Sequence, residues 1–333
     1  MKILVTGGTG FLGRRTVARL VERGHEVRLL VRPGSSRQRF PDSVGFAEGD
    51  VTDRGSVERA VEGCEALVHA AALVKILAPP SEFDRINLGG LDNALGAAAS
   101  RGVRRIVYVS SFIALGPTER GPGGVLDETA EPHERRWIND YERTKTLADA
   151  SARKAIELGA PLSVVYPGVI YGPGELTEGN IVVRHILDLA HGKLPALLGR
   201  PERRWNYAFV DDVAEGVVRT LEQAPAGARY VLGGENVTSA EFYGQVADLG
   251  GIRVPQRRMP DGVAKAAGAA MKLWARLSGG TPQLTPDLVE IYRHDWAYDS
   301  SRAAREIGYA PRSLRDGLSE TFAWLRGTPE WRG

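Results

Sequence analysis

Hydrophobic residues in the first half of the chain fall into short β-rich runs that alternate with amphipathic stretches. The runs predict strands at residues 2–7, 26–32, 44–50, 65–72 and 104–111, and the stretches between them predict helices at 11–24, 56–63 and 83–102. Strands separated by helices are joined by right-handed crossovers, which place helices on both faces of a parallel sheet. The pattern therefore predicts an α/β fold with a doubly wound parallel Rossmann sheet.

The second half of the chain continues this pattern and then departs from it. It predicts helices at 139–159, 211–223, 239–251 and 262–280, a strand with a turn at 161–172, and a strand at 228–234. Residues 112–136 are rich in glycine, proline and glutamate and predict a long surface loop. We therefore predict two domains, a dinucleotide-binding one and a smaller, mostly helical substrate-binding one. The first domain covers residues 1–172, and the chain returns to it near 205–232. The second domain covers 173–204 and 233–333.

Charge and cysteine content exclude several classes of protein. The 333 residues include 43 basic and 41 acidic ones, and a net charge of +2 does not favour nucleic acid as a partner. The single cysteine, Cys64, rules out an internal disulfide framework and a multi-cysteine metal site, so no metal is expected. The first residues lead straight into a glycine-rich turn without a signal-peptide pattern, and no apolar run has the length to span a bilayer. We expect a cytoplasmic protein without a membrane partner.

The helix predicted at 262–280 carries Lys265, Lys272 and Arg276, as an amphipathic membrane-surface helix would. Its apolar residues are mostly alanines, which give weak affinity for a bilayer. We therefore expect this helix to pack over the substrate cleft.

Four glycines lie in the seven residues GGTGFLG, directly after the first predicted strand. Gly8, Gly10 and Gly13 fit the spacing G-x-G-x-x-G, and Gly7, Gly10 and Gly13 fit G-x-x-G-x-x-G. In either register the turn exposes backbone N–H groups and the positive end of the helix dipole to an anionic pyrophosphate. A strand precedes the turn and an amphipathic helix follows it, so we predict a dinucleotide site that includes Gly7, Gly10, Phe11, Leu12 and Gly13.

The end of the second strand bears on the choice of cofactor. An acidic residue there would hold the ribose of NAD, but this chain has Arg32, followed by Ser35, Ser36 and Arg37. The guanidinium groups of Arg32 and Arg37 suit a 2′-phosphate, so we predict NADP(H), with NAD left open. The alternative is that Arg32 stacks on adenine or faces solvent.

Two further strand ends are predicted to meet the cofactor. Asp50 and Val51 follow the third strand and would lie at the adenine edge, while the small residues Ala70, Ala71 and Ala72 after the fourth strand would let backbone approach the dinucleotide. A plain role at a strand end is the alternative for both.

Tyr141 and Lys145 are four residues apart and therefore share one helical face. A phenol loses its proton near pH 10, so work at neutrality requires a neighbouring charge that favours the phenolate. An ammonium supplies such a charge and also hydrogen-bonds the nicotinamide ribose. Ser110 or Ser111, at the end of the fifth strand, would donate to a carbonyl oxygen that gains negative charge. This combination predicts acid–base catalysis of hydride transfer.

These segments together resemble an extended short-chain dehydrogenase/reductase of the NAD-dependent epimerase/dehydratase superfamily. The similar stretches run nearly end to end: VTGGTGFLG, GDVTD, HAAA, INLGGLDNAL, VYVSS, YERTK, YPGVIYGPG, FVDDVAEGVV and DSSRAAREIGYAPRSLRDGL. VRLLVRPGSS, VEGCEALVHAAA and YVLGGENVT are most similar to the dihydroflavonol-reductase-like and hopanoid-associated epimerase groups, with bacterial 3β-hydroxysteroid dehydrogenase-like proteins as close relatives.

The resemblance implies a role for each catalytic residue. It makes Tyr141 the general acid/base, Lys145 its partner and Ser111 the carbonyl-orienting serine, because the family's serine begins an S-x-x-x-x-G run, here SFIALG. It places Pro167 and Gly168 beside the nicotinamide and implies a homodimer through paired helices.

The resemblance also implies structural residues. It makes Asn87 a helix asparagine with a structural role, and it makes Asp211 and Asp212 a helix cap and an interdomain contact rather than catalysts.

Some positions depart from the nucleotide-sugar members of the superfamily. Those members carry an Arg-Asp pair where this chain has Trp205 and Asn206, although Arg203 and Arg204 precede these residues. Leu115 and Tyr166 also replace residues typical of sugar enzymes, and the changes favour a carbonyl or alcohol substrate. An NADP(H)-dependent oxidoreductase is therefore the leading hypothesis. A nucleotide-sugar epimerase or dehydratase is the second and a non-catalytic NADP sensor the third.

Overall fold

The parallel sheet predicted from the alternating pattern is present in the computed structural model, which describes residues 1–75, 77–131, 136–280 and 282–331. In the described chain it has seven strands in the order β3-β2-β1-β4-β5-β6-β9. Their bounds are β1 (Lys2–Thr6), β2 (Glu26–Val31), β3 (Gly45–Glu48), β4 (Ala66–His69), β5 (Arg105–Val109), β6 (Leu162–Pro167) and β9 (Arg229–Leu232). The strand order reverses between β1 and β4, so a crevice for a ligand opens at their carboxyl ends.

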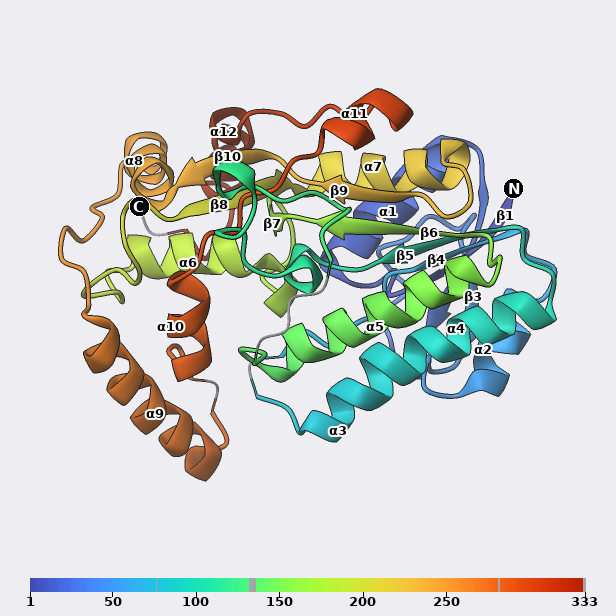
Figure 1. Ribbon diagram of the computed structural model, residues 1–333, viewed down its shortest axis with the longest axis horizontal. Helices are drawn as coiled ribbons and strands as arrows, with labels where there is room; N and C mark the ends of the chain where they lie inside the picture. Colours follow the sequence, from blue (N-terminus) through green and yellow to red (C-terminus); the bar gives the residue numbers. More distant parts are fainter. Residues whose placement is uncertain (76, 132–135, 281, 332–333) are drawn as a thin grey trace.

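Alternating side chains on each strand bury both faces of this sheet. In β1, Ile3 and Val5 join the core on one face, and Leu4 joins the core on the other. Helices α1 (Phe11–Glu22), α7 (Val210–Gln223) and α11 (Ser301–Ile307) cover the first face, and α2 (Arg54–Val61), α4 (Gly89–Ser100) and α5 (Asp140–Glu157) cover the second (Figure 1). Short helices α3 (Pro80–Phe83) and η1 (Asp84–Leu88) lead into α4. The doubly wound Rossmann fold is confirmed.

A second unit is built on a three-stranded sheet in the order β10-β8-β7. Its elements are β7 (Val169–Tyr171), β8 (Arg204–Phe209), β10 (Glu235–Thr238), α6 (Ile181–Ala190), α8 (Ser239–Gly250) and α12 (Leu314–Leu325). Aromatic rings hold this unit together, and the rings of Tyr207 and Phe242 stack at 4.4 Å between centroids. Helices α9 (Asp261–Ser278) and α10 (Pro286–Tyr292) project from this unit (Figure 1). The predicted residue bounds of the two domains stay a prediction.

The structure differs from the sequence-based expectation in several segments. The strand and turn predicted at 161–172 is two strands in different sheets, because Gly168 breaks the run where Asn206 leaves no space for a Cβ atom. Strands β8 and β10 and helices α6, α10, α11 and α12 were not predicted. The surface loop predicted at 112–136 contains the short helices η2 (Phe112–Leu115) and η3 (Pro122–Gly124), and η2 is largely buried. Residues 132–135 of that segment lie outside the described residues.

A buried hydrogen-bond network joins α5 to β6. The Tyr166 hydroxyl donates to the Asp149 carboxylate at 2.5 Å, and Arg153 Nε donates to the same carboxylate at 2.7 Å. Because Tyr166 and Asp149 are buried, Asp149→Ala leaves the phenol without its acceptor. We expect this variant to lower the free energy of unfolding by about 3 kcal/mol in urea denaturation.

The control for this prediction is Asp188→Ala, which removes a carboxylate that pairs with Lys193 at the surface. That change is expected to cost no more than about 1 kcal/mol. Equal losses in the two variants would contradict a structural role for the network.

Candidate active site

The glycine turn lies where the strand order reverses between β1 and β4, and its backbone packs directly against the backbone of Ala70 and Ala71. Gly7 has a φ of 73°, and a Cβ atom there would lie 2.5 Å from the amide nitrogen of Ala71. A Cβ on Gly13 would overlap the carbonyl oxygen of Gly7 and lie 2.8 Å from the Gly8 Cα. Side chains are therefore excluded from the turn on both sides, which leaves its backbone open to a ligand.

Helix α1 begins at this turn without a side-chain cap. Its N-cap residue is Gly10, and Phe11 and Leu12 form the first helical positions. The first amides of a helix have no partner within it, so they point toward the crevice with the positive end of the helix dipole. A pyrophosphate fits this arrangement. The structure thus places Gly7, Gly10, Phe11, Leu12 and Gly13 together, as a dinucleotide site requires.

The two arginines after β2 differ in their surroundings. Arg37 pairs with Glu48, and its guanidinium carbon lies 5.3 Å from the centroid of the Phe46 ring. Arg32 is exposed, and its guanidinium makes no hydrogen bond or ion pair with any residue that the structure describes. Its charge reaches Asp50, whose pKa is raised by burial but lowered overall by hydrogen bonds with Thr52 and by nearby arginines. Arg32 is thus available to an anion, whereas Arg37 is already paired.

The remaining predicted cofactor residues lie at neighbouring strand ends. The Ala70 amide donates to the Thr6 carbonyl at 3.1 Å, which holds the segment Ala70–Ala72 beside the glycine turn. Val51 follows β3 and packs against α4, where a Cβ on Gly90 would lie 3.2 Å from it. Pro167 ends β6 and Gly168 follows it, next to the end of β5 in the sheet order.

Local capping fixes where Tyr141 and Lys145 stand on α5. The Asn139 side chain accepts a hydrogen bond from the Glu142 amide at 2.8 Å, so the helix starts there and Tyr141 lies in its first turn. Asn87 secures the same region, because its side chain accepts from the Leu73 amide at 2.7 Å and donates to Thr144 at 3.0 Å. The structural role expected of Asn87 fits these contacts.

Ser111, Tyr141 and Lys145 meet at the carboxyl end of β5. Burial raises the pKa of the Tyr141 phenol above its usual value, and a hydrogen bond with Ser111 opposes that rise. Lys145 Nζ donates to the Val109 carbonyl at 3.1 Å and lies 5.1 Å from the centroid of the Tyr108 ring. Burial lowers the pKa of Lys145 to about 7, so its ammonium and neutral forms are close in free energy at neutral pH.

His69 is a residue of this crevice to which the sequence assigned only a strand-end position. Its Nδ1 is hydrogen-bonded to Thr6 Oγ1 at 2.9 Å, whereas its buried Nε2 has no partner among the described residues. Burial, with the charge of Lys145, lowers the pKa of His69 to about 3, so the imidazole is neutral at physiological pH. Its sequence signal is the polar residue that ends the apolar strand before the alanines.

The acidic pair Asp211 and Asp212 has one of its two expected roles. The N-cap of α7 is Phe209, so neither aspartate is the cap, and both lie in the first turn instead. Asp212 pairs with Arg312 at 3.0 Å, which joins α7 to the segment before α12. The expected interdomain contact is present, and the expected cap is wrong because α7 starts at Val210, before both aspartates.

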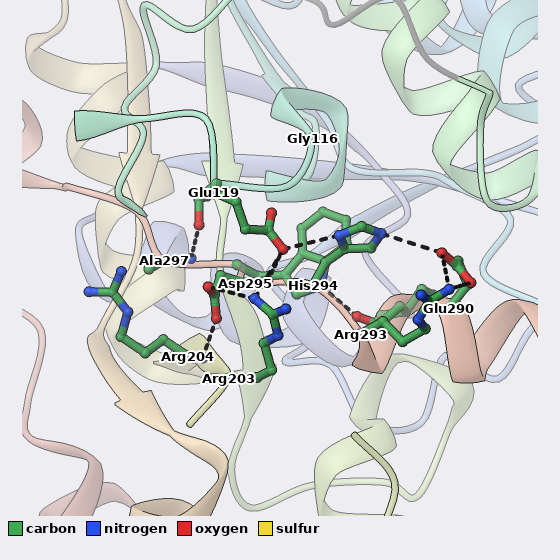
Figure 2. Close-up of polar contacts among 12 residues, drawn as sticks. Gly116, Glu119, Arg203, Arg204, Glu290, Arg293, His294, Asp295 and Ala297 are labelled. Carbon is green, nitrogen blue, oxygen red and sulfur yellow. Dashed lines mark hydrogen bonds and ion pairs between the residues drawn. The ribbon is translucent and has the colours of Figure 1, made fainter. Parts of the chain in front are cut away.

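A charged cavity of about 450 Å³ lies between the loop after η2, the segment before β8 and α10. Figure 2 shows Arg203 between Glu119 and Asp295, with distances of 3.4 Å and 3.1 Å to their carboxylates. Arg204 donates to the carbonyls of Gly123 and Gly124. The two arginines considered for phosphate binding are therefore both engaged by the protein.

The fold and the crevice define an NAD(P)-dependent enzyme, a short-chain dehydrogenase/reductase of the extended type. The chain belongs to the NAD dependent epimerase/dehydratase family, whose profile matches residues 3–233. Sterol demethylase protein B of Methylococcus capsulatus is 31% identical over 332 residues, or 98% of each chain. The 3 beta-hydroxysteroid dehydrogenase/Delta 5-->4-isomerase of Mycobacterium tuberculosis is 29% identical, over 93% of this chain and 86% of that protein. The crystal structure of gox2253 superposes with a TM-score of 0.83 at 33% identity, over 99% of each chain.

Proposed function

We propose that this enzyme is an NADP(H)-dependent oxidoreductase that transfers hydride between the nicotinamide and a carbonyl or secondary alcohol. The observation that carries the proposal is the meeting of Ser111, Tyr141 and Lys145 at the carboxyl end of β5, beside the glycine turn's crevice. Hydroxyl, phenol and amine are the groups that carbonyl reduction requires of a protein.

The roles of the three side chains follow from their chemistry. Bound NADPH supplies the hydride. Tyr141 donates its phenolic proton to the carbonyl oxygen, and Ser111 donates a hydrogen bond that orients that oxygen and stabilises its developing charge. Lys145, once protonated, favours the phenolate that remains on Tyr141. In alcohol oxidation the same groups act in the reverse order.

A panel of ketones and aldehydes with NADPH tests this proposal. We expect loss of NADPH absorbance with some of its members, and no consumption across a broad panel would contradict it. Steroid ketones belong in the panel because a relative is named as a 3 beta-hydroxysteroid dehydrogenase.

The preference for NADP(H) is proposed from Arg32, the exposed guanidinium at the end of β2. Arg32→Ala is expected to lower kcat/KM for NADPH by about 10- to 100-fold, because it removes a charge-assisted contact to a phosphate. The kcat/KM for NADH should change little. The measurement is the ratio of the two specificity constants.

The control for Arg32 is Arg101→Ala. Arg101 ends α4 just before the start of β5, so it lies at the amino ends of the strands, whereas the crevice lies at their carboxyl ends. There it is paired with Glu62. It should leave both constants unchanged. A wild-type cofactor ratio in the Arg32 variant would contradict the assignment.

The second candidate function is a nucleotide-sugar epimerase or dehydratase. The cavity's four arginines favour it: Arg120, Arg200, Arg203 and Arg293. Carboxylates already pair with two of these, since Arg203 contacts Asp295 and Arg293 contacts Asp261. A UDP-sugar should raise the melting temperature only if this candidate is correct.

A further inference from the structure

Helix α9 turns its small residues inward. Ala264, Gly268 and Ala275 are the buried positions of the helix. A Cβ on Gly268 would lie 2.8 Å from the carbonyl carbon of Thr285, so small residues are required where α9 meets the start of α10. From the sequence, the apolar face of this helix is expected to consist mostly of alanines. Two of them, Ala264 and Ala275, face the protein and not the solvent.

The large apolar residues of α9 point outward instead. The exposed fraction is 58% for Val263, 60% for Leu273, 71% for Trp274 and 77% for Leu277. At 3.6 residues per turn these positions form one stripe along the helix, opposite the buried face. A helix with an apolar face on both sides needs cover on the outer one, because water is a poor solvent for a continuous apolar stripe.

Basic side chains outnumber acidic ones on the helix that carries this stripe. Lys265, Lys272 and Arg276 follow one edge of the helix, and the only acidic residue within α9 is Asp261. Residues 253–278 contain six basic side chains and one acidic one, although the whole chain is nearly balanced at 43 to 41. Lys265 and Lys272 contact carboxylates of α10, and Arg276 is exposed.

We propose that α9 docks flat on the surface of an anionic lipid bilayer, with Val263, Leu273, Trp274 and Leu277 inserted among the acyl chains. An apolar stripe edged by basic residues is the pattern that such surfaces bind. No helix in the described part of the chain has the length and apolarity to cross a membrane, so α9 lies on the bilayer and does not span it. This revises the expectation of no membrane partner.

A second copy of the chain fits the stripe less well. A twofold contact would place the same surface on both sides, so the partner's α9 would offer one acidic side chain, equivalent to Asp261, against three basic ones. Anionic headgroups supply the missing negative charge.

Vesicle flotation tests the proposal with the full chain. We expect binding to vesicles of phosphatidylcholine with phosphatidylglycerol, weaker binding to phosphatidylcholine alone, and a further decrease as salt rises. The double variant Leu273→Ser/Leu277→Ser is expected to bind the anionic vesicles at least about tenfold more weakly. Arg276→Gln should reduce binding to the anionic vesicles alone.

The matched control is Leu158→Ser, because Leu158 is 79% exposed and lies at the end of α5, far along the chain from α9. It should bind as the wild type does. Because the replaced leucines are exposed, thermal unfolding of the double variant should also match the wild type. Absence of wild-type binding, or equal binding by the double variant, would overturn the proposal.

Size-exclusion chromatography with light scattering tests the alternative explanation, in which the stripe is covered by self-association of the chain. A wild-type dimer that the double variant converts to a monomer, together with no vesicle binding, would assign the stripe to self-association and contradict the membrane proposal. The test needs no substrate or turnover, so its outcome is independent of the proposed hydride transfer.

Discussion

Tyr141→Phe is expected to lower kcat for NADPH-dependent carbonyl reduction by about a thousandfold, because it removes the proton donor while it preserves the ring. Tyr141 lies in the first turn of α5, within hydrogen-bond reach of Ser111. The phenylalanine ring fills the same space, so the affinity for NADP should stay within about twofold of the wild-type value, as expected when only transition-state stabilisation is lost. Stopped-flow single-turnover rates and fluorescence titration with NADP measure the two quantities.

Two further variants distinguish a catalytic phenol from a structural one. Tyr309→Phe removes another buried hydroxyl, one with no partner among the described residues, and should leave kcat unchanged. Ser111→Ala should reduce kcat by about a hundredfold, since it removes one hydrogen bond to the developing oxyanion. Turnover of Tyr141→Phe at the wild-type rate would exclude the assigned mechanism.

The first half of the fold could be predicted because its strands and helices have clear periods. Strand β1, the turn and α1 were all predicted, since an apolar run, a glycine cluster and an amphipathic repeat follow one another within 22 residues. The spacing of Tyr141 and Lys145 also predicted a shared helical face. It could not predict that Lys145 donates to the Val109 carbonyl, because that contact joins residues 36 positions apart.

Other features lacked a local signal. Strand β8 begins with Arg204 and could not be predicted, because paired arginines indicate a loop or a phosphate site. What makes this segment a strand is its pairing with β10, which lies about 30 residues further along the chain. The burial of η2 could not be predicted, because the glycines and prolines that follow it indicate a surface loop. The sidedness of α9 could not be predicted because both faces are apolar, and only the contact with α10 decides which one is covered. Periodicity locates a face only where one side is polar.

Gly13→Ala is expected to produce the second-largest loss, in cofactor binding and in stability together. The new Cβ would overlap the carbonyl oxygen of Gly7, which is backbone and cannot rotate away. We expect the turn to open, at a cost of about 3 kcal/mol in the free energy of unfolding. The affinity for NADP should fall by about a hundredfold, because the amides of the turn no longer converge on the pyrophosphate.

The matched control for Gly13 is Gly244→Ala in α8, where a Cβ meets nothing within 4 Å. Alanine favours the helical conformation, so this change should stabilise the protein by about 0.5–1 kcal/mol and leave NADP binding unaltered. Urea denaturation and fluorescence titration of both variants provide the comparison. Wild-type affinity for NADP in Gly13→Ala would mean that the dinucleotide does not lie on this turn, because no ligand could use its backbone after such a displacement.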